Sequence, residues 1–324
     1  MNKAFVFGKF LPFHKGHEAM IKFALTKCDF LSVLICCSNK ETYSCEIRKN
    51  WIEKCFSDVK NIEILTYNYD EDELPNTSQT STEISKIWSE VFKEIFPNHN
   101  LLITSEPYGE YVAQFMNIKH IAFDIERNNF PVSASQIKKN LFQFWNYLPE
   151  SVKPDFVMKI VILGTESTGK TILSERLAKH YNCGLVSETA REIIANSNNF
   201  SYEDLLKIVE KHSGSIKKAT SDFPMLIIDT DIHITNSYSI QYFKKELEIN
   251  TEFYKINKAN LYLYLKNDVP YFQDGTRLSE EDRNELDISH RKVLKKHNIN
   301  YLEISGNWDE RFEKSKFYID KLIE

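Results

Sequence analysis

The chain has 324 residues, a length that predicts two domains, each large enough for a hydrophobic core of its own. Hydrophobic residues make up 42% and charged residues 27%, as in soluble globular proteins, and no apolar run approaches the roughly 18 residues of a membrane span. The net charge of −5 argues against broad nucleic-acid binding, which needs a basic face. The amino terminus lacks a signal-peptide pattern, so we expect a cytoplasmic protein with neither a membrane nor a DNA partner.

Five of the six cysteines are clustered in the first 55 residues, and none forms a Cys-x-x-Cys pair. The six are Cys28, Cys36, Cys37, Cys45, Cys55 and Cys183. Metal sites need recognisable pair spacing, and disulfide frameworks belong to small secreted domains. We therefore expect all of these cysteines to be reduced, small and mostly buried.

The first half of the chain alternates short apolar runs with stretches of helical periodicity. The runs predict strands at Ala4–Phe7, Phe30–Cys37, Ile62–Tyr67, Leu101–Thr104 and His120–Phe123. Helical periodicity covers Glu18–Thr26, Glu46–Phe56 and Ser81–Ile95. Strands that alternate with helices predict a parallel, doubly wound sheet, in which ligands bind at the carboxyl ends of the strands.

Two histidines follow the first predicted strand, in His14-Lys15-Gly16-His17. They are too close together for a zinc site on a helix turn without further ligands. Imidazole or imidazolium N–H groups beside a helix N-terminus can instead hold the polyphosphate of a nucleoside triphosphate. A local structural role is the alternative.

A second stretch, from Pro131 to Lys138, places Ser133, Ser135 and a cation at the start of a predicted helix. The alternative is a serine N-cap followed by a solvated lysine. Together with the histidines, it resembles the paired signatures of the nucleotidyltransferase superfamily, His-x-Gly-His and Ile-Ser-x-Thr/Ser-x-Ile-Arg. Lys138 stands where that superfamily has arginine, so the charge is kept and the bidentate geometry is lost.

The join between the domains is predicted from Phe144 to Pro154, a stretch with two prolines and no periodicity. Domain one is expected to cover residues 1–150 and domain two residues 151–324. The short linker favours packed domains.

A P-loop opens the second half. The apolar run Lys159–Leu163 is followed by Gly-x4-Gly-Lys-Thr and then by an amphipathic stretch, the strand–loop–helix context that this motif requires. Its backbone N–H groups cradle phosphate, Lys170 reaches the β- and γ-phosphates, and the Thr171 hydroxyl can ligate magnesium. The predicted ATP site consists of Gly164, Thr165, Glu166, Ser167, Thr168, Gly169, Lys170 and Thr171.

Together with Lys159–Leu163, four further apolar runs predict a second five-stranded sheet. They are Leu185–Glu188, Met225–Asp229, Leu261–Leu265 and Tyr301–Ile304. Asp229 ends a strand, where P-loop enzymes place an acidic residue near magnesium or the attacking hydroxyl. Asp231 could face the same side, and helix capping by the aspartates is the alternative.

Farther along, Arg277 and Arg283 flank the polar run from Leu278 to Asp282. Arginines on a closing lid could neutralise charge on a transferred phosphoryl group. The alternative, surface solvation, is strongest for Arg283. We assign no catalytic role to the stretch from Gly306 to Phe312.

Several strings in order resemble the bifunctional nicotinamide-nucleotide adenylyltransferase/ribosylnicotinamide kinase family (NadR-like) along essentially the whole chain. They include Leu74 to Ser78, Ser85 to Trp88, Thr104 to Gly109, Asp124 to Arg127, and Asp268 to Arg277, in which Tyr271 replaces a common tryptophan. The resemblance implies two α/β domains, a Rossmann-like nucleotidyltransferase followed by a P-loop kinase. Some relatives carry an N-terminal DNA-binding domain, and with a first strand predicted at Ala4 we expect this chain to lack one.

The resemblance also implies site residues. ATP in the first domain would contact Gly8, Lys9, Phe10, His14, His17, Ser133, Ser135 and Lys138. The mononucleotide would contact Trp88, Tyr108, Asp124 and Arg127. The kinase nucleoside would contact Glu188, Arg191, Asp229, Asp231 and Tyr271, with Arg277 on ATP and Thr171 and Asp229 on magnesium. His14, His17, Lys170, Asp229 and Asp231 would be catalytic.

The predicted function is two-step NAD salvage. ATP would phosphorylate nicotinamide riboside, and a second ATP would adenylylate the mononucleotide to give NAD and pyrophosphate, with Mg²⁺ as cofactor. Two alternatives stay open: the same reactions on another nucleoside or phosphate acceptor, and a metabolite-sensing regulator with vestigial catalysis. The sequence leaves the oligomeric state open, a homo-oligomer included.

Overall fold

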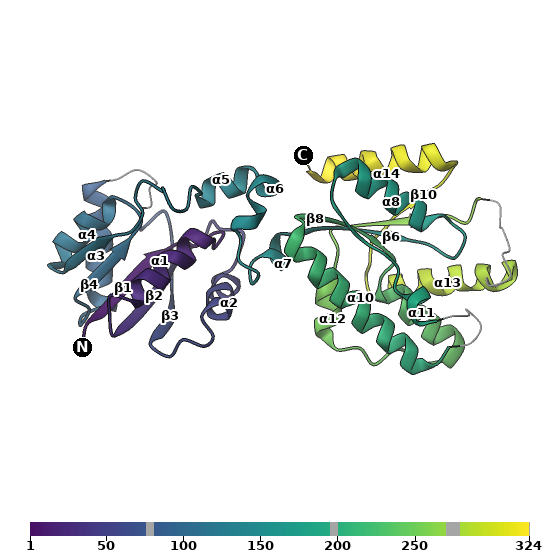
Figure 1. The fold of residues 1–324 in the computed structure, drawn as a ribbon, viewed down its shortest axis with the longest axis horizontal. Coiled ribbons are helices and arrows are strands. Elements are labelled where there is room, and N and C mark those ends of the chain that lie inside the picture. Colours follow the sequence, from purple (N-terminus) through teal and green to yellow (C-terminus); the bar gives the residue numbers. More distant parts are fainter. Residues whose placement is uncertain (76–80, 195–199, 270–278, 324) are drawn as a thin grey trace. The chain divides into compact units, whose positions relative to one another are not determined.

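The computed structural model describes residues 1–75, 81–194, 200–269 and 279–323. The chain forms two compact units, Met1–Lys153 and Pro154–Glu324, each a sheet covered by helices (Figure 1). The division between the units lies inside the stretch Phe144–Pro154 that was predicted as the join, three residues after the predicted domain bound at residue 150. Within the described residues, no helix is both long and apolar enough to cross a bilayer.

The first unit contains one five-stranded parallel sheet with strand order β3-β2-β1-β4-β5. Its strands are β1 (Lys3–Gly8), β2 (Phe30–Ser38), β3 (Ile62–Tyr69), β4 (Leu101–Thr104) and β5 (Lys119–Ala122). Its helices are α1 (Lys15–Leu25), α2 (Cys45–Cys55), α3 (Thr82–Ile95), α4 (Tyr108–Met116), α5 (Ala134–Lys139), α6 (Leu141–Phe144) and the 3-10 turn η1 (Trp145–Tyr147). Helix α7 (Lys153–Phe156) spans the division between the units.

Helices lie on both faces of this sheet. Phe5 of β1 and Leu34 of β2 pack with Trp88 and Phe92 of α3 and with Val112 of α4 in one buried cluster. Helices α1 and α2 add no residue to that cluster and contact β1, β2 and β3. Because side chains alternate along a strand, a sheet covered in this way is apolar on both faces, as the continuous runs of β1 and β2 indicate.

The second unit has its own five-stranded parallel sheet, ordered β10-β9-β6-β8-β7. The strands are β6 (Met158–Leu163), β7 (Gly184–Val186), β8 (Met225–Asp229), β9 (Leu261–Leu265) and β10 (Leu302–Ile304). The helices are α8 (Lys170–Tyr181), α9 (Ala190–Ile193), α10 (Tyr202–Asp222), α11 (Ile232–Phe243), α12 (Thr251–Asn257), α13 (Glu280–Lys296) and α14 (Trp308–Ile323).

One face of this sheet is covered by α8 and α14, whose Leu177 and Phe312 pack with Ile162 of β6. A separate cluster joins α10 to α11 through Ile208 and Ile232. The prediction of two doubly wound parallel sheets is confirmed. In each sheet the strand order reverses beside the first strand, β1 or β6, and ligands of such sheets bind in the crevice at that point.

Among the predicted boundaries that differ from the structure, two affect candidate site residues. Helix α1 starts at Lys15, three residues before the predicted Glu18, because the His14 side chain caps it by accepting from the Gly16 N–H. Strand β7 ends at Val186, so Glu188 lies beyond it. The helix shift brings His17 into the first turn of α1.

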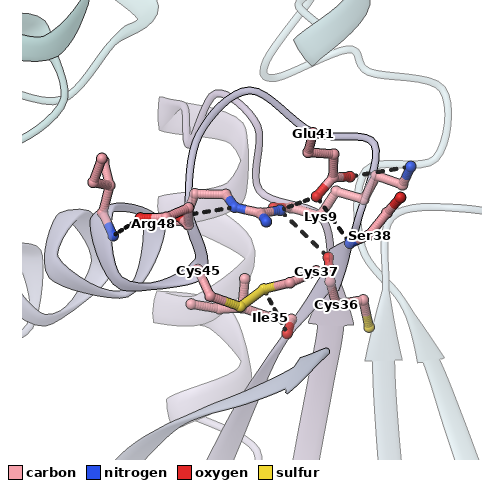
Figure 2. Close-up of a disulfide and its surroundings, with 10 residues drawn as sticks. Lys9, Ile35, Cys36, Cys37, Ser38, Glu41, Cys45 and Arg48 are labelled. Atoms are coloured by element: carbon pink, nitrogen blue, oxygen red, sulfur yellow. Dashed lines mark hydrogen bonds and ion pairs between the residues drawn. A yellow bond between two sulfur atoms is a disulfide. The ribbon is translucent and has the colours of Figure 1, made fainter. Parts of the chain in front are cut away.

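The expectation of six reduced cysteines is wrong for Cys37 and Cys45, which form a disulfide (Figure 2). Cys37 is near the end of β2 and Cys45 is the first residue of α2, so the turn between them brings their Cα atoms within 5.8 Å. That separation lies in the usual range for disulfides. The other four cysteines are free.

Candidate active sites

The two histidines form a stacked pair at the start of α1, with ring centroids 3.7 Å apart. His14 Nδ1 accepts from the backbone N–H of Gly16 at 3.2 Å, and His17 Nδ1 accepts from the backbone N–H of His14 at 3.4 Å. Because Nδ1 is the acceptor in each ring, a neutral ring carries its hydrogen on Nε2. Both side chains therefore cap the helix and also present an Nε2–H donor.

Burial keeps both rings neutral. It lowers the pKa of His14 to about 3, and the nearby Arg127 guanidinium lowers that pKa further. Burial, with His14 and Arg127, also holds the pKa of His17 well below its ordinary value. Of the two forms that the sequence allows, imidazole and imidazolium, the structure favours imidazole. The pair offers hydrogen-bond donors rather than positive charge.

We expect these histidines to make the protein less stable in acid. Above their ordinary pKa of 6.5 they are neutral in both folded and unfolded chains and contribute no pH dependence. As pH falls from 6.5 toward about 3, His14 becomes protonated in the unfolded chain but stays neutral in the folded chain. The free energy of unfolding therefore decreases. Well below the unfolded pKa, the slope is about 1.4 kcal/mol per pH unit for each such histidine.

Urea unfolding at about pH 6, 5 and 4 measures this slope. His14→Asn keeps a good N-cap residue and removes the imidazole, so its slope should be smaller than that of the wild type. Equal slopes would show that His14 does not resist protonation.

A cavity of about 720 Å³ collects most of the predicted ATP residues of the first unit. Its wall contains Gly8, Lys9, Phe10, His17, Ser135 and Lys138, together with Thr104, Ser105 and Glu106. Burial lowers the pKa of Lys138. His14 and Ser133 are not in this wall. Ser133 is the N-cap of α5 and forms a capping box with Gln136, as in the alternative interpretation of this serine.

A neighbouring cavity of about 560 Å³ shares Phe7, Gly8, Lys9 and Tyr108 with the first. Trp88 and Tyr69 complete its aromatic wall, and Trp88 donates its indole N–H to the Pro75 carbonyl at 3.1 Å. The structure therefore brings two of the predicted mononucleotide residues, Trp88 and Tyr108, into one pocket.

The other two predicted mononucleotide residues lie outside both cavity walls. The Asp124 carboxylate accepts hydrogen bonds from the backbone N–H groups of Asn129 and Phe130 and so stabilises the loop between them. Arg127 donates to the Val132 carbonyl and pairs with Glu106, a residue of the larger cavity, at 2.8 Å. Arg127 thus stands next to the larger cavity.

The lysine on the shared wall is engaged by carboxylates. Lys9 Nζ lies 2.8 Å from Glu71 and 3.1 Å from Glu41. Burial alone would lower the pKa of Lys9, but the two glutamates outweigh it and raise that pKa. Lys9 is therefore a fixed positive charge where the two cavities meet.

In the second unit, the P-loop connects β6 to α8 as predicted. Gly164 has a φ of +142°, and a Cβ there would come within 2.9 Å of the Leu265 carbonyl, so only glycine fits beside β9. Lys170 Nζ donates to the Thr165 carbonyl at 3.1 Å, across the loop. Thr168 closes the same turn by donating to Thr165 at 2.7 Å.

The two aspartates after β8 have different surroundings. Asp229 accepts from the Thr171 hydroxyl at 2.6 Å, and its buried Oδ1 has no hydrogen-bond partner among the described residues. Asp231 is the N-cap of α11 and accepts from the N–H groups of His233 and Ile234 and from the His233 ring. Asp231 is therefore the helix cap of the alternative reading, and Asp229 has an oxygen available for a cation.

Some predicted residues lie outside the described structure. Tyr271 and Arg277 fall in residues 270–278, and Arg191 belongs to α9 with its side chain outside the description. Glu188 is half-buried after β7. Arg283 is fully buried in α13 and donates to the Asn267 carbonyl at 3.5 Å, so its surface reading is wrong.

Arg311 is a site residue that the sequence did not reveal. Its buried guanidinium donates to the P-loop carbonyl of Thr168 at 2.6 Å, to Gly306 at 2.8 Å and to Lys266 at 2.9 Å. It also pairs with the carboxylate of Asp268. The sequence contains no signal that indicates the contact between Arg311 and the P-loop.

Family models match each unit separately. The citrate lyase ligase C-terminal domain matches residues 4–144, and the AAA domain matches residues 159–311. The chain is 29% identical over 333 residues to the trifunctional NAD biosynthesis/regulator protein NadR of Escherichia coli (strain K12). That similarity covers 95% of this chain and 80% of the relative.

Two solved structures share the fold of the whole chain. A NadR protein in complex with NR matches with a TM-score of 0.65 and 20% identity, over 97% of this chain and 94% of that one. A NadR protein in complex with NAD and AMP-PNP matches with the same TM-score and identity, over 99% and 95%. The order of the two units is therefore the same in all three chains.

Proposed function

Because this chain belongs to the NadR-like family, we propose that it is a bifunctional enzyme of NAD salvage. The second unit transfers the γ-phosphoryl group of ATP to the 5′-hydroxyl of nicotinamide riboside and releases ADP. The first unit joins the resulting mononucleotide to the adenylyl group of another ATP and releases pyrophosphate.

The observation that carries the first activity is the pair of cavities with a common wall at Gly8 and Lys9. ATP occupies the larger cavity, and the pyridine of the mononucleotide occupies the aromatic one beside Trp88 and Tyr108. Their phosphates then meet at the common wall. There a phosphate oxygen of the mononucleotide attacks the α-phosphorus and displaces pyrophosphate.

Charge stabilisation comes from donors of different kinds. His17 supplies a neutral Nε2–H, His14 supports it by stacking, and Lys9 and Lys138 supply charge. The nucleophile is already an anion, so no general base is needed. Arg127 leaves its ion pair with Glu106 and binds the phosphates instead. Asp124 stabilises the conformation of the loop that carries Arg127. Ser135 adds a hydroxyl, and Ser133 caps the helix behind it.

For the kinase step, the backbone of Gly164–Thr171 surrounds the phosphates and Lys170 stabilises the transferred group. Magnesium suits the oxygen donors Thr171 and Asp229, because the buried Asp229 Oδ1 has no hydrogen-bond partner in the part of the chain that the structure describes. When bound, the ion neutralises charge on the phosphate oxygens. Asp229 orients the riboside hydroxyl, and Asp231 supports it as the cap of α11. Glu188, Arg191 and Tyr271 hold the nucleoside, and Arg277 contacts ATP.

Product chromatography tests both activities. The purified chain is incubated with ATP, magnesium and either nicotinamide riboside or the mononucleotide. We expect mononucleotide and then NAD from the riboside, and NAD with pyrophosphate from the mononucleotide. Failure to make NAD from the mononucleotide overturns the first assignment, and failure to phosphorylate the riboside overturns the second.

A further inference from the structure

Arg48 is a buried cation behind the common wall of the two cavities of the first unit. Its side chain is only 1% exposed, although it belongs to α2, a helix with an exposed outer face. Figure 2 shows its guanidinium between Lys9, Cys36 and Glu41. Arg48 is absent from both cavity walls, so it does not touch their contents.

Its hydrogen bonds connect the ends of two neighbouring strands. Arg48 Nη1 donates to the carbonyl of Lys9, just after β1, at 3.0 Å and to the carbonyl of Cys36, near the end of β2, at 3.4 Å. Lys9 lines both cavities and Cys36 lines the aromatic one. The guanidinium therefore holds the backbone from which the common wall is built.

Glu41 extends this hold to the side chain of Lys9. Its carboxylate lies 2.7 Å from Arg48 Nη1 and 3.1 Å from Lys9 Nζ, and it accepts from the Ser38 N–H at 3.1 Å. Glu41 is itself 8% exposed, in the loop that the Cys37–Cys45 disulfide closes. Lys9 is thus anchored twice, at its carbonyl by Arg48 and at its ammonium by a carboxylate that Arg48 holds.

We propose that Arg48 is a positioning residue for adenylyl transfer, and that it acts through Lys9. This inference rests on the adenylyltransferase activity proposed above. Arg48 keeps the Lys9 ammonium at the place where the phosphates of ATP and of the mononucleotide meet. The Arg48 guanidinium is held at two of its nitrogens: Nε donates to the Ser44 carbonyl at 3.4 Å, while Nη1 contacts Lys9, Cys36 and Glu41. A lysine ammonium is a single point charge and cannot reproduce both sets of contacts.

The first part of the test compares Arg48→Lys and Arg48→Met with Lys49→Met. Lys49 lies on the same helix, is partly exposed and pairs only at 3.6 Å with Glu53. We expect the Arg48 variants to lose adenylyl transfer by on the order of 10- to 100-fold, as misplacement of a reacting group does. Riboside phosphorylation by the same samples should stay at the wild-type rate, as should both activities of Lys49→Met.

The second part is a double-mutant cycle with Lys9→Met on kcat/KM for adenylyl transfer. If Arg48 acts through Lys9, Arg48→Lys costs little once Lys9 is gone. If Arg48 has only a structural role, Arg48→Lys lowers kcat/KM by the same factor with and without Lys9, and that result overturns the proposal. Full activity of Arg48→Lys overturns it as well.

Two substitutes keep the test usable. Lys9→Arg is the background if Lys9→Met is too slow to measure, and Glu41→Gln replaces the Arg48 variants if they unfold. A wild-type chain without adenylyl transfer refutes the proposed function instead.

Discussion

We expect Lys170→Ala to abolish phosphorylation of nicotinamide riboside and to leave NAD synthesis from the mononucleotide intact. In the structure the Lys170 ammonium reaches across the P-loop to the Thr165 carbonyl, the position from which it turns to the transferred phosphoryl group. Removal of one preorganised charge from a phosphoryl-transfer site costs at least about 100- to 1,000-fold in rate. Initial rates of mononucleotide and NAD formation, measured on the same sample, give both results.

The matched control is Lys179→Ala, which removes an exposed lysine from the last turn of the same helix, α8. Both of its activities should equal those of the wild type. If Lys170→Ala stops both reactions while the protein remains folded, the two activities share one site and the division of labour proposed here is wrong.

His17→Ala should abolish adenylyl transfer and leave the kinase reaction unchanged. The substitution removes the Nε2–H donor in the wall of the ATP cavity, a loss of about 100- to 1,000-fold for an electrostatic donor. It also removes a helix cap, because His17 Nδ1 accepts from the His14 N–H, and caps contribute about 1 kcal/mol. Alanine alone therefore confounds chemistry with stability.

His17→Gln separates the two effects. Glutamine is a usual residue at this third position of a capping box, so the variant retains the cap and loses the imidazole. We expect a melting temperature near that of the wild type and adenylyl transfer as low as in His17→Ala. Wild-type activity of the glutamine variant would limit His17 to a capping role.

The fold and the phosphate loops could be predicted because their signals are local. The strand–loop–helix of Gly164–Thr171 is readable from a dozen adjacent residues, and so is the His14–His17 turn that follows β1. The parallel sheets followed from the alternation of apolar runs with helical periodicity. The strand order, which the structure supplies, places both loops at the switch points.

What could not be predicted depends on contacts between distant segments. Asp229 and Asp231 look equivalent in sequence, and only the hydrogen bonds of α11 show that Asp231 is committed to a helix terminus. The Cys37–Cys45 pair has a spacing with no diagnostic value until the turn between β2 and α2 is known. Arg48 and Arg311 resemble surface helix residues, yet each holds a loop carbonyl from a buried position.

The contact between Arg311 and Thr168 determines when the kinase site can be completed during protein synthesis. The two residues are 143 positions apart, and the ribosome adds about 5–20 residues per second. Arg311 is therefore made roughly 7–30 seconds after Thr168. In the first unit, Met1–Lys153, the corresponding anchors come earlier, since Arg48 follows Lys9 by 39 positions and Glu71 follows it by 62. On the ribosome, the adenylyltransferase unit can therefore mature first, although its substrate is the product of the unit made after it.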